Sequence, residues 1–340
     1  MGLGGVGQRH LRNLRTLRPE CRVAALRHGG RTFEIGNDMA ADMGVDIVAK
    51  YGVEVVADMN AALAFGPDVA IVANPSAKHV EACLPLLRAG VPVFLEKPAA
   101  TTPADYAALD TAQKAAGAPL AVGYQLRWHP CVLRLKDILD DGALGQLHSV
   151  EISVQTHMPS WHAYEKPTEF YAGVRTLGGG VVLTEIHEID LLTWFFGQPD
   201  TVYAVGGTLG SYNIDVEDTF AATLSCRADG RLLPISLSMS FVQAPPSRRF
   251  VVNGSAGVAI LEIPKLRLTV LGSDGAGRET LDATGFDRNA MFTDELTHFL
   301  DCVAGKRAPL TSLGGIRAGQ MTAFAIRRSL ESGQPESPER

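Results

Sequence analysis

The stretch Gly2-Leu3-Gly4-Gly5-Val6-Gly7 (GLGGVG, residues 2–7) decides the fold, because its glycines have the G-x-G-x-x-G spacing of a dinucleotide-binding turn. In such a turn the first glycine permits a tight bend, the second lets the backbone approach a pyrophosphate, and the third lets a helix pack closely on the sheet. A helical stripe of Val6, His10, Leu11, Leu14 and Leu17 follows. We therefore expect a dinucleotide at this helix N-terminus, contacted by Gly2, Gly4, Gly5, Val6 and Gly7.

The motif begins at the second residue and leaves no room for the strand that normally precedes such a turn. Met1 alone cannot fill a central position in a sheet, which needs about five apolar residues. We expect either that the first strand was lost through a misassigned start or that another segment covers its place. Of these two explanations, truncation is favoured.

Five short apolar runs with helical segments between them fill the first third of the chain. They are CRVAAL (21–26), VEVVA (53–57), DVAIVA (68–73), VPVFLE (91–96) and PLAVG (119–123). Apolar runs without polar alternation are typical of strands covered on both faces of a parallel sheet. The pattern predicts a doubly wound α/β domain of the Rossmann type over residues 1–122. One of its helices is expected to have Ser76 as N-cap and to be kinked or broken near Glu81 by Pro85.

The pattern changes beyond residue 123, where helices are expected at 130–140 and 183–196, with a strand at 148–157 between them. Alternating runs then extend from 201 to 272 and are separated by Gly, Asp and Pro turn signals. Two further helices are expected at 290–304 and 313–331. We predict an α+β domain with a mainly antiparallel open sheet over residues 123–331, followed by a frayed polar tail at 332–340.

Composition excludes several classes of protein. The formal net charge of −6 argues against nucleic-acid binding, which usually requires a basic surface. Five cysteines, odd in number and far apart, are typical of reduced thiols in the cytoplasm. No apolar run approaches the ~18 residues of a membrane helix. We expect a cytoplasmic protein with no membrane or nucleic-acid partner.

The end of the second expected strand reads Leu26-Arg27-His28, where an acidic residue would hold the ribose 2′-hydroxyl of NAD. Arg27 and His28, with the nearby Arg31, could instead meet a 2′-phosphate, so NADP is slightly favoured over NAD. A solvated charge at the end of the strand remains the alternative explanation for Arg27.

The turn Glu96-Lys97-Pro98 follows another expected strand, at the edge where ligands of open α/β sheets collect. A partly desolvated lysine beside a cofactor can transfer a proton near neutral pH. By position alone, a surface ion pair before a turn is the simpler explanation.

Several motifs then occur in a characteristic order: GLGGVGQRHLRNL (2–14), ANPSAKH (73–79), EKP (96–98), GYQLRWHP (123–130) and GGGVVLTEIHEID (178–190). This ordered set resembles the Gfo/Idh/MocA oxidoreductase family, and looks closest to members associated with sugar or sugar-nucleotide metabolism. The resemblance implies an NAD(P)-binding Rossmann domain and a second domain whose open sheet makes oligomer contacts. It implies that Lys97 lies near the reacting hydroxyl, that His187 is the acid/base and that Asp190 is its neighbour or a substrate anchor. Thr184 departs from the pattern, since many relatives carry Asp there.

Further residues are candidates for the two binding sites. Asn74, Ser76, His79, Glu96 and Lys97 could line the path from the adenosine ribose to the nicotinamide. Arg127, Trp161, His162, Tyr171 and Arg175 could shape a sugar pocket, although ordinary packing or surface roles explain these five equally well.

The function implied is an NAD(P)-dependent oxidoreductase that interconverts a secondary alcohol and a ketone on a sugar, sugar nucleotide or cyclitol. Two alternatives are an NAD-dependent glycosidase of the same fold and a non-catalytic NADP-sensing regulator. No metal is expected, because His157 and His162 do not have the spacing of a known zinc site. A homodimer or homotetramer is expected from the open sheet face.

Overall fold

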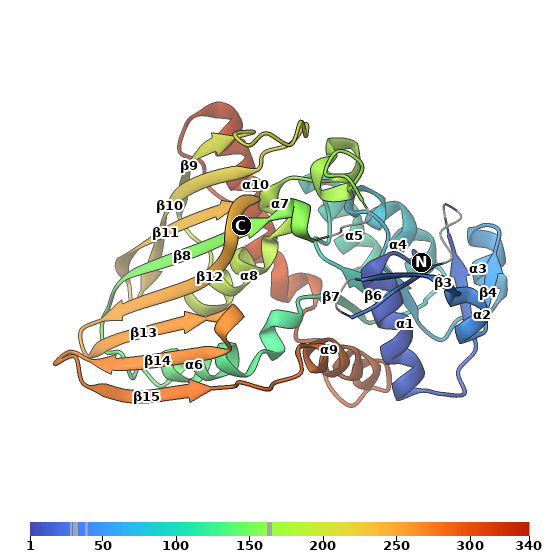
Figure 1. Cartoon of the computed structure of the whole chain (residues 1–340), viewed down its shortest axis with the longest axis horizontal. Coiled ribbons are helices and arrows are strands. Elements are labelled where there is room, and N and C mark those ends of the chain that lie inside the picture. Colours follow the sequence, from blue (N-terminus) through green and yellow to red (C-terminus); the bar gives the residue numbers. More distant parts are fainter. Residues whose placement is uncertain (28, 30–32, 38–39, 162–164, 340) are drawn as a thin grey trace.

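The computed structural model describes residues 1–27, 29, 33–37, 40–161 and 165–339 of the chain. Its N-terminal part carries the short parallel strands, and its C-terminal part is built on one large sheet (Figure 1). This is the predicted combination of a Rossmann-type domain with a mainly antiparallel α+β domain. Within the described ranges, no helix combines the length and the apolar character needed to cross a bilayer.

All five predicted strands of the N-terminal part are present. The strands β1 (Val23–Leu26) and β4 (Val53–Val56) form one parallel pair, and β5 (Ala70–Val72), β6 (Val93–Glu96) and β7 (Leu120–Gly123) form a parallel sheet of three. The sequence did not reveal the antiparallel pair β2 (Phe33–Ile35) and β3 (Ala41–Asp46). The helices are α1 (Gly5–Leu17), α2 (Ile47–Tyr51), α3 (Met59–Ala64), α4 (His79–Arg88) and α5 (Pro103–Ala116).

The carboxyl ends of β1 and β5 are joined by the first two residues. The amino group of Met1 donates to the carbonyl of Ile71 in β5, and the carbonyl of Met1 accepts from the N–H of Ala73, just after that strand. The N–H of Gly2 donates to the carbonyl of Leu26 in β1. The strands β1 and β5 themselves belong to separate sheets in the described structure. The first turn of α1 is thereby placed at the carboxyl ends of both sheets, where ligands of α/β folds bind.

The expected N-cap in the segment after β5 was wrong. Ser76 is not an N-cap but the first residue of a short 3₁₀ turn, η1 (Ser76–Lys78), and α4 begins only at His79. Pro85 lies inside α4 without breaking it.

The C-terminal sheet has eight strands in the order β15-β14-β13-β12-β8-β11-β10-β9. All its neighbouring pairs are antiparallel except β8 with β11. Burial alternates along β10, so one face of the sheet is covered and the other is open. The strands are β8 (Leu147–His157), β9 (Thr201–Gly207), β10 (Thr219–Ala228), β11 (Arg231–Ser240), β12 (Val242–Gly254), β13 (Gly257–Glu262), β14 (Arg267–Gly272) and the unpredicted β15 (Gly277–Asp282).

Five helices accompany this sheet: α6 (Pro130–Asp140), α7 (Val181–Thr184), α8 (Ile186–Phe196), α9 (Arg288–Val303) and α10 (Leu313–Ser332). The helix predicted at 183–196 is interrupted at Glu185, which separates α7 from α8. In addition, α9 packs on the N-terminal part, where Phe299 and Leu296 contact Phe94 of β6 and Ala121 of β7. The two parts are thus joined by packing as well as by the chain.

The described part of the polar tail, residues 332–339, is not frayed as predicted. Glu336 forms an isolated β-bridge with Val202 of β9, and its carboxylate pairs with Arg328 of α10. The backbone N–H and carbonyl of Glu336 therefore hydrogen-bond to the edge strand β9 rather than to water.

Candidate active site

The three motif glycines occupy the three environments that a dinucleotide turn requires. Gly2 has φ +82°, and a Cβ there would lie 2.7 Å from the carbonyl oxygen of Ala73. A Cβ on Gly7 would lie 2.3 Å from the carbonyl oxygen of Gly2, whereas a Cβ on Gly4 would meet nothing within 4 Å. Gly2 and Gly7 are thus needed for close packing, and Gly4 leaves open space beside the helix N-terminus.

The start of α1 has no side-chain cap. The N–H groups of Gly5, Val6 and Gly7 lie in its first turn, where no intrahelical acceptor exists for them. Nearby, the Asn74 Oδ1 atom is buried without a partner, next to the residues that Gly2 contacts. A pyrophosphate at the helix end and a polar ligand group beside Asn74 fit these unsatisfied atoms.

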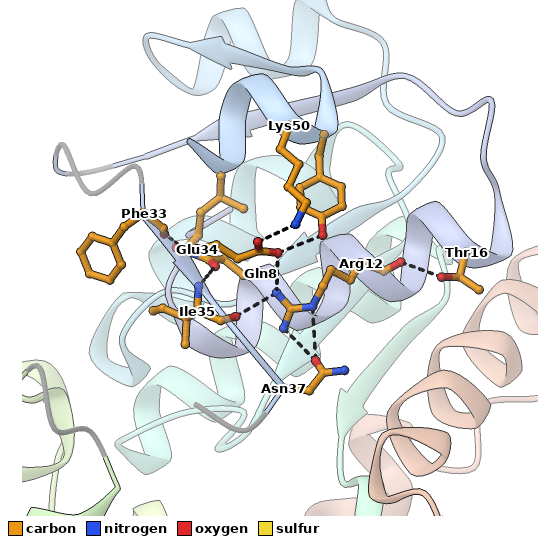
Figure 2. A network of polar contacts seen from close by, with 10 residues as sticks. Gln8, Arg12, Thr16, Phe33, Glu34, Ile35, Asn37 and Lys50 are labelled. Carbon is orange, nitrogen blue, oxygen red and sulfur yellow. Dashed lines mark hydrogen bonds and ion pairs between the residues drawn. The ribbon is translucent and has the colours of Figure 1, made fainter. Parts of the chain in front are cut away.

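A polar network fixes α1 against β2, as Figure 2 shows. Gln8 accepts a hydrogen bond from the Ile35 N–H at 2.6 Å and donates to the carbonyls of Leu3 and Phe33. One turn later, Arg12 donates to the carbonyl of Ile35 and to the Asn37 side chain. The glycine loop is therefore braced by the segment that follows β1, a role for Gln8 that the glycine pattern alone did not reveal.

Two buried side chains connect the glycine loop to the Glu96-Lys97-Pro98 turn. The His10 Nε2 atom of α1 lies 2.6 Å from Glu96 Oε1. The ring of His79 lies between the carbonyl oxygens of Pro98 and Asn74, at 2.7 and 2.9 Å. Two of the predicted cofactor-lining side chains, Glu96 and His79, are thus buried and hold the turn.

Lys97 reaches across to the C-terminal part. Its Nζ atom donates a hydrogen bond to the carbonyl oxygen of Thr184, 2.6 Å away. The interruption at Glu185, whose φ and ψ are −97° and 32°, ends α7 at Thr184. A carbonyl at a helix end lacks its intrahelical donor, and here the lysine supplies the hydrogen bond.

His187 lies in the first turn of α8, buried to 5% exposure. Its Nε2 atom is 3.4 Å from the Gln125 amide, and the Tyr124 ring meets its edge. Burial lowers the pKa of His187 well below its ordinary value, and the positive charges of Lys97 and Arg248 lower this pKa further. The imidazole is therefore neutral near pH 7, with a buried Nδ1 that has no partner.

Asp190 is not the neighbour that orients His187. Its two carboxylate oxygens accept hydrogen bonds from Arg127 at 2.6 and 2.8 Å. Arg127 also donates to the carbonyls of Leu310 and Gly315. Both side chains are almost completely buried, which favours the packing role that was the alternative explanation for Arg127. Asp190 lies on α8 with His187, as the helix spacing predicted, but its carboxylate pairs with the buried guanidinium of Arg127.

The remaining predicted residues have various environments. Ser76 is buried under Gly178, and Arg175 donates to the backbone carbonyl of Asp215. Trp161 packs edge-on against Phe241, with ring centroids 5.1 Å apart. Burial raises the pKa of Tyr171 above its ordinary value, and the positive charge of Lys97 opposes this increase. Arg27 directly follows β1. His28, Arg31 and His162 lie outside the described residues.

An ion cluster beside His187 escaped the sequence analysis. Arg248 of β12 contacts the carboxylates of Glu185 and Glu188, and its Nε atom lies 2.8 Å from Glu188 Oε1. Glu188 is completely buried, and burial raises its pKa to about 7. The available signal in the sequence was the run Glu185-Ile186-His187-Glu188, in which two acids flank the histidine. Among the described residues, no three His, Cys, Asp or Glu side chains are grouped to hold a metal ion.

Solved structures share this fold over nearly the whole chain. The dehydrogenase WlbA of Bordetella pertussis, in complex with NADH and UDP-GlcNAcA, is 21% identical with a TM-score of 0.78, and the match covers 100% of this chain and 97% of that one. The myo-inositol 2-dehydrogenase of Lactobacillus plantarum is 23% identical with a TM-score of 0.77, covering 99% and 98%. At these identities the likeness shows the fold.

Curated relatives include inositol 2-dehydrogenase 2 of Saccharopolyspora erythraea, 29% identical over 58% of this chain and 53% of the relative. The inositol 2-dehydrogenase of Gluconacetobacter diazotrophicus is 31% identical over 57% of this chain and 52% of its own length. The match thus spans about half the length of each of these two relatives. An uncharacterised oxidoreductase of Bacillus subtilis, YrbE, matches over 100% of this chain and 95% of its own length at 24% identity.

Two family models cover most of the chain. Residues 1–124 match the model described as the oxidoreductase family with an NAD-binding Rossmann fold, and residues 132–260 match the Gfo/Idh/MocA C-terminal domain. The glycine loop and the Glu96-Lys97-Pro98 turn lie within the first match, and His187 lies within the second. This chain belongs to the Gfo/Idh/MocA family of oxidoreductases.

Proposed function

We propose that this protein is an NAD(P)-dependent dehydrogenase that interconverts a secondary alcohol and a ketone on a cyclitol, sugar or sugar nucleotide. One observation carries the proposal. The Lys97 amine donates a hydrogen bond to the carbonyl of Thr184, three residues before His187, and its charge helps to keep this histidine neutral. His79 links the same turn to Asn74, beside the glycine motif, and Glu96 links it to His10 of α1. A proton-transfer pair thus stands next to a dinucleotide-binding turn.

The glycine loop would hold the cofactor. The uncapped first turn of α1 and the open space at Gly4 suit a pyrophosphate, and Asn74 Oδ1 is free to accept from a polar group of the ligand. When bound, a nicotinamide cofactor supplies the site for hydride transfer with the substrate carbon. Arg27, at the end of β1 and with no acid beside it, supports a preference for NADP over NAD.

His187 and Lys97 would divide the proton chemistry between them. A neutral buried imidazole can accept the proton of the substrate hydroxyl. The Lys97 amine donates one hydrogen bond to the Thr184 carbonyl. Its remaining N–H groups can donate to the substrate oxygen and stabilise negative charge there. In the opposite direction the same groups return the proton to the ketone oxygen.

Tyr171 and Trp161 are the candidates for contacting the ring of the substrate. Tyr171 lies close enough to Lys97 for its charge to act on the phenol. Trp161 and Phe170 pack edge-on with ring centroids 6.1 Å apart, in the segment that leads to Tyr171. Aromatic faces suit the apolar C–H faces of a cyclitol or a pyranose. The inositol dehydrogenases among the relatives support this substrate class.

The open face of the C-terminal sheet supports a homo-oligomer. Tyr203 and Val205 of β9 and Leu209 after it are 44%, 52% and 69% exposed. Large apolar side chains of this kind are typical of contacts between copies. Light scattering on the purified protein should give the mass of a dimer or a tetramer. A monomer at micromolar concentration would contradict this part of the proposal.

A substrate screen tests the activity. Cyclitols, monosaccharides and sugar nucleotides are offered with NAD⁺ or NADP⁺, and the near-ultraviolet absorbance of the reduced cofactor is followed. We expect reduction with at least one polyol, and a rate lower by about 10² to 10⁴-fold in a Lys97→Ala variant. Release of an aryl glycoside without net cofactor reduction would favour the glycosidase. Tight cofactor binding that survives Lys97 and His187 substitution, with no turnover, would favour the redox-sensing regulator.

A further inference from the structure

The glycine triplet at 178–180 lies between the two parts of the protein but has no role in the chemistry described so far. A Cβ on Gly178 would lie 2.7 Å from the side chain of Thr101, in the N-terminal part. A Cβ on Gly179 would lie 2.5 Å from the carbonyl oxygen of Ala172. The chain therefore packs closely on two sides of the triplet, and a side chain at either position would displace its neighbours.

Gly180 makes the third close contact, with a carboxylate from a distant loop. Its φ is +108°, and a Cβ there would overlap the Oε1 atom of Glu217. Glu217 belongs to the loop between β9 and β10. Its carboxylate therefore occupies space that only a glycine leaves free, directly before the first residue of α7.

Glu217 holds the start of α7 at two points. Gly180, the residue before this helix, has no side chain to cap it. The N–H of Val181 donates to the backbone carbonyl of Glu217 at 2.9 Å, and the N–H of Val182 donates to its Oε1 atom at 3.4 Å. Both N–H groups lie in the first turn, where no intrahelical acceptor exists for them. These two hydrogen bonds, the Glu217 cap, take the place of the missing side chain.

The other end of α7 carries the carbonyl that receives the lysine. The helix consists of a single turn, in which the N–H of Thr184 donates to the carbonyl of Gly180 at 3.0 Å. The N–H of Glu185 likewise donates to the carbonyl of Val181 at 3.0 Å. The Lys97 amine donates to the carbonyl of Thr184 at 2.6 Å. A displacement at the start of α7 therefore moves this carbonyl, because no further turn lies between them.

The loop that carries Glu217 is itself fixed to the sheet. The next residue, Asp218, is completely buried, and its carboxylate accepts hydrogen bonds from the N–H groups of Leu209 and Gly210, both at 2.9 Å. The N–H of Asp218 donates to the carbonyl of Gly207, the last residue of β9. Glu217 thus contacts α7 from a position that the edge of the sheet determines.

We propose that Glu217 is a positioning residue, which holds the first turn of α7 and thereby places the Thr184 carbonyl where it receives the Lys97 amine. The effect on α7 exists without cofactor or substrate. Its consequence for turnover rests on the proposed function, in which Lys97 acts at the substrate oxygen. The side chain can be tested by itself, because the hydrogen bond from Val181 to the Glu217 backbone is retained in every variant.

Hydrogen exchange in the ligand-free protein tests the Glu217 cap. In Glu217→Ala, the amides of Thr184 and Glu185, which close α7, should exchange faster by about fivefold or more, because a lost cap shifts a local opening equilibrium by this amount. Glu331→Ala, an exposed acid on α10, is the matched control and should leave this exchange unchanged. Unchanged exchange in Glu217→Ala would overturn the inference.

Two conservative variants separate the hydrogen bond from the charge, and they keep a polar group at this position if Glu217→Ala folds poorly. Glu217→Gln keeps the length of the side chain and an oxygen acceptor, so exchange in α7 should stay within about twofold of the parent. Glu217→Asp keeps the charge but is one methylene shorter, so it should resemble Glu217→Ala. Slow exchange in Glu217→Asp with fast exchange in Glu217→Gln would contradict a cap that acts through its hydrogen bond.

Turnover tests whether Glu217 acts through Lys97. Glu217→Ala should lower kcat by about tenfold with little change in KM, because the amine is displaced while the substrate still binds, and Glu217→Gln should restore most of this loss. In a Lys97→Ala background, Glu217→Ala should have almost no further effect on kcat, because the group that it places is absent. Equal losses in the two backgrounds would show that Glu217 does not act through Lys97.

The two measurements separate this inference from the proposed function. Normal turnover in Lys97→Ala would remove the proposed role of the lysine, whereas faster exchange in Glu217→Ala would still establish the effect of the Glu217 cap on α7. Unchanged exchange in Glu217→Ala, together with a reduced kcat in Lys97→Ala, would overturn this inference and leave the proposed function in place.

Discussion

The Lys97 Nζ atom lies 2.6 Å from the carbonyl oxygen of Thr184, and this hydrogen bond joins the end of β6 to the interruption between α7 and α8. The two residues are far apart in the sequence and come from the two matched regions of the family. The contact brings a positive charge from the Rossmann part to the helix that carries His187. The proposed chemistry depends on this contact, because neither part alone contains both groups.

Replacing Lys97 should affect turnover far more than cofactor binding. In Lys97→Ala the group that stabilises charge on the substrate oxygen is lost, so kcat should fall by about 10² to 10⁴-fold. The dissociation constant of the reduced cofactor, measured by fluorescence, should change little, since the glycine loop is untouched. Lys78→Ala is the matched control, because Lys78 is exposed and, among the described residues, forms its ion pair with Glu81. Normal turnover by Lys97→Ala would refute the assignment.

Two alanine substitutions in the glycine motif should have opposite consequences. Gly4 has open space around it, so Gly4→Ala should keep the free energy of unfolding and weaken cofactor binding by about tenfold or more, because the new methyl group enters the space meant for the pyrophosphate. A Cβ on Gly7 would lie 2.3 Å from the Gly2 carbonyl oxygen, so Gly7→Ala should lower the free energy of unfolding by about 1–3 kcal/mol. Urea denaturation and cofactor titration measure the two effects. Equal stability losses in both variants would contradict this division.

The buried ion pair of Asp190 and Arg127 predicts a structural role for Asp190. Asp190→Asn leaves a buried guanidinium without its counter-charge and should lower the free energy of unfolding by about 3 kcal/mol. In Arg127→Met/Asp190→Leu no charge is left unpaired, so stability should partly recover despite the loss of the Leu310 and Gly315 hydrogen bonds. Denaturation curves for the three proteins provide the comparison. An Asp190→Asn protein that is as stable as the parent but inactive would favour a catalytic role instead.

His129 should make the protein sensitive to acid. Its Nδ1 atom accepts the Cys131 N–H at the start of α6, and burial followed by repulsion from Arg288 lowers its pKa from 6.5 to about 4. Below pH 6.5 the unfolded chain therefore binds this proton before the folded protein does. Stability is present in full above about pH 6.5 and is lost as the pH falls toward 4, by about 3 kcal/mol in total.

His129→Asn isolates this effect, because asparagine caps a helix well and does not titrate. The difference in free energy of unfolding between pH 6.5 and pH 4 should be smaller in this variant than in the parent by about 3 kcal/mol. Urea denaturation at several pH values measures it, with the exposed His148→Asn as control. If both variants follow the parent curve, His129 does not contribute to acid unfolding.

Much of the fold follows from local sequence pattern. The five apolar runs of the first part became five parallel strands, because a run without polar alternation is stable only where both faces are covered. The alternating runs of the second part became a sheet with one covered face, because alternation puts the apolar side chains of a strand on one side and the polar ones on the other. The short pair β2 and β3 was missed, since neither strand has a regular alternating pattern and β2 is held by hydrogen bonds from Gln8 and Arg12 of α1 to its carbonyls.

The glycine turn and the identity of Lys97 and His187 as candidates were determined by the sequence, because glycine spacing and residue chemistry are local properties. The partners of these groups were decided only by the tertiary structure. Helix spacing suggested that Asp190 serves His187, yet a buried guanidinium from η2 (Gln125–Trp128) takes both of its oxygens. Arg248 reaches Glu185 and Glu188, on either side of His187 in the sequence, from a strand about sixty residues away, and no periodicity links them. Charge–charge interactions act through space in a medium of low dielectric constant, so their strength depends on distances that only the folded chain defines.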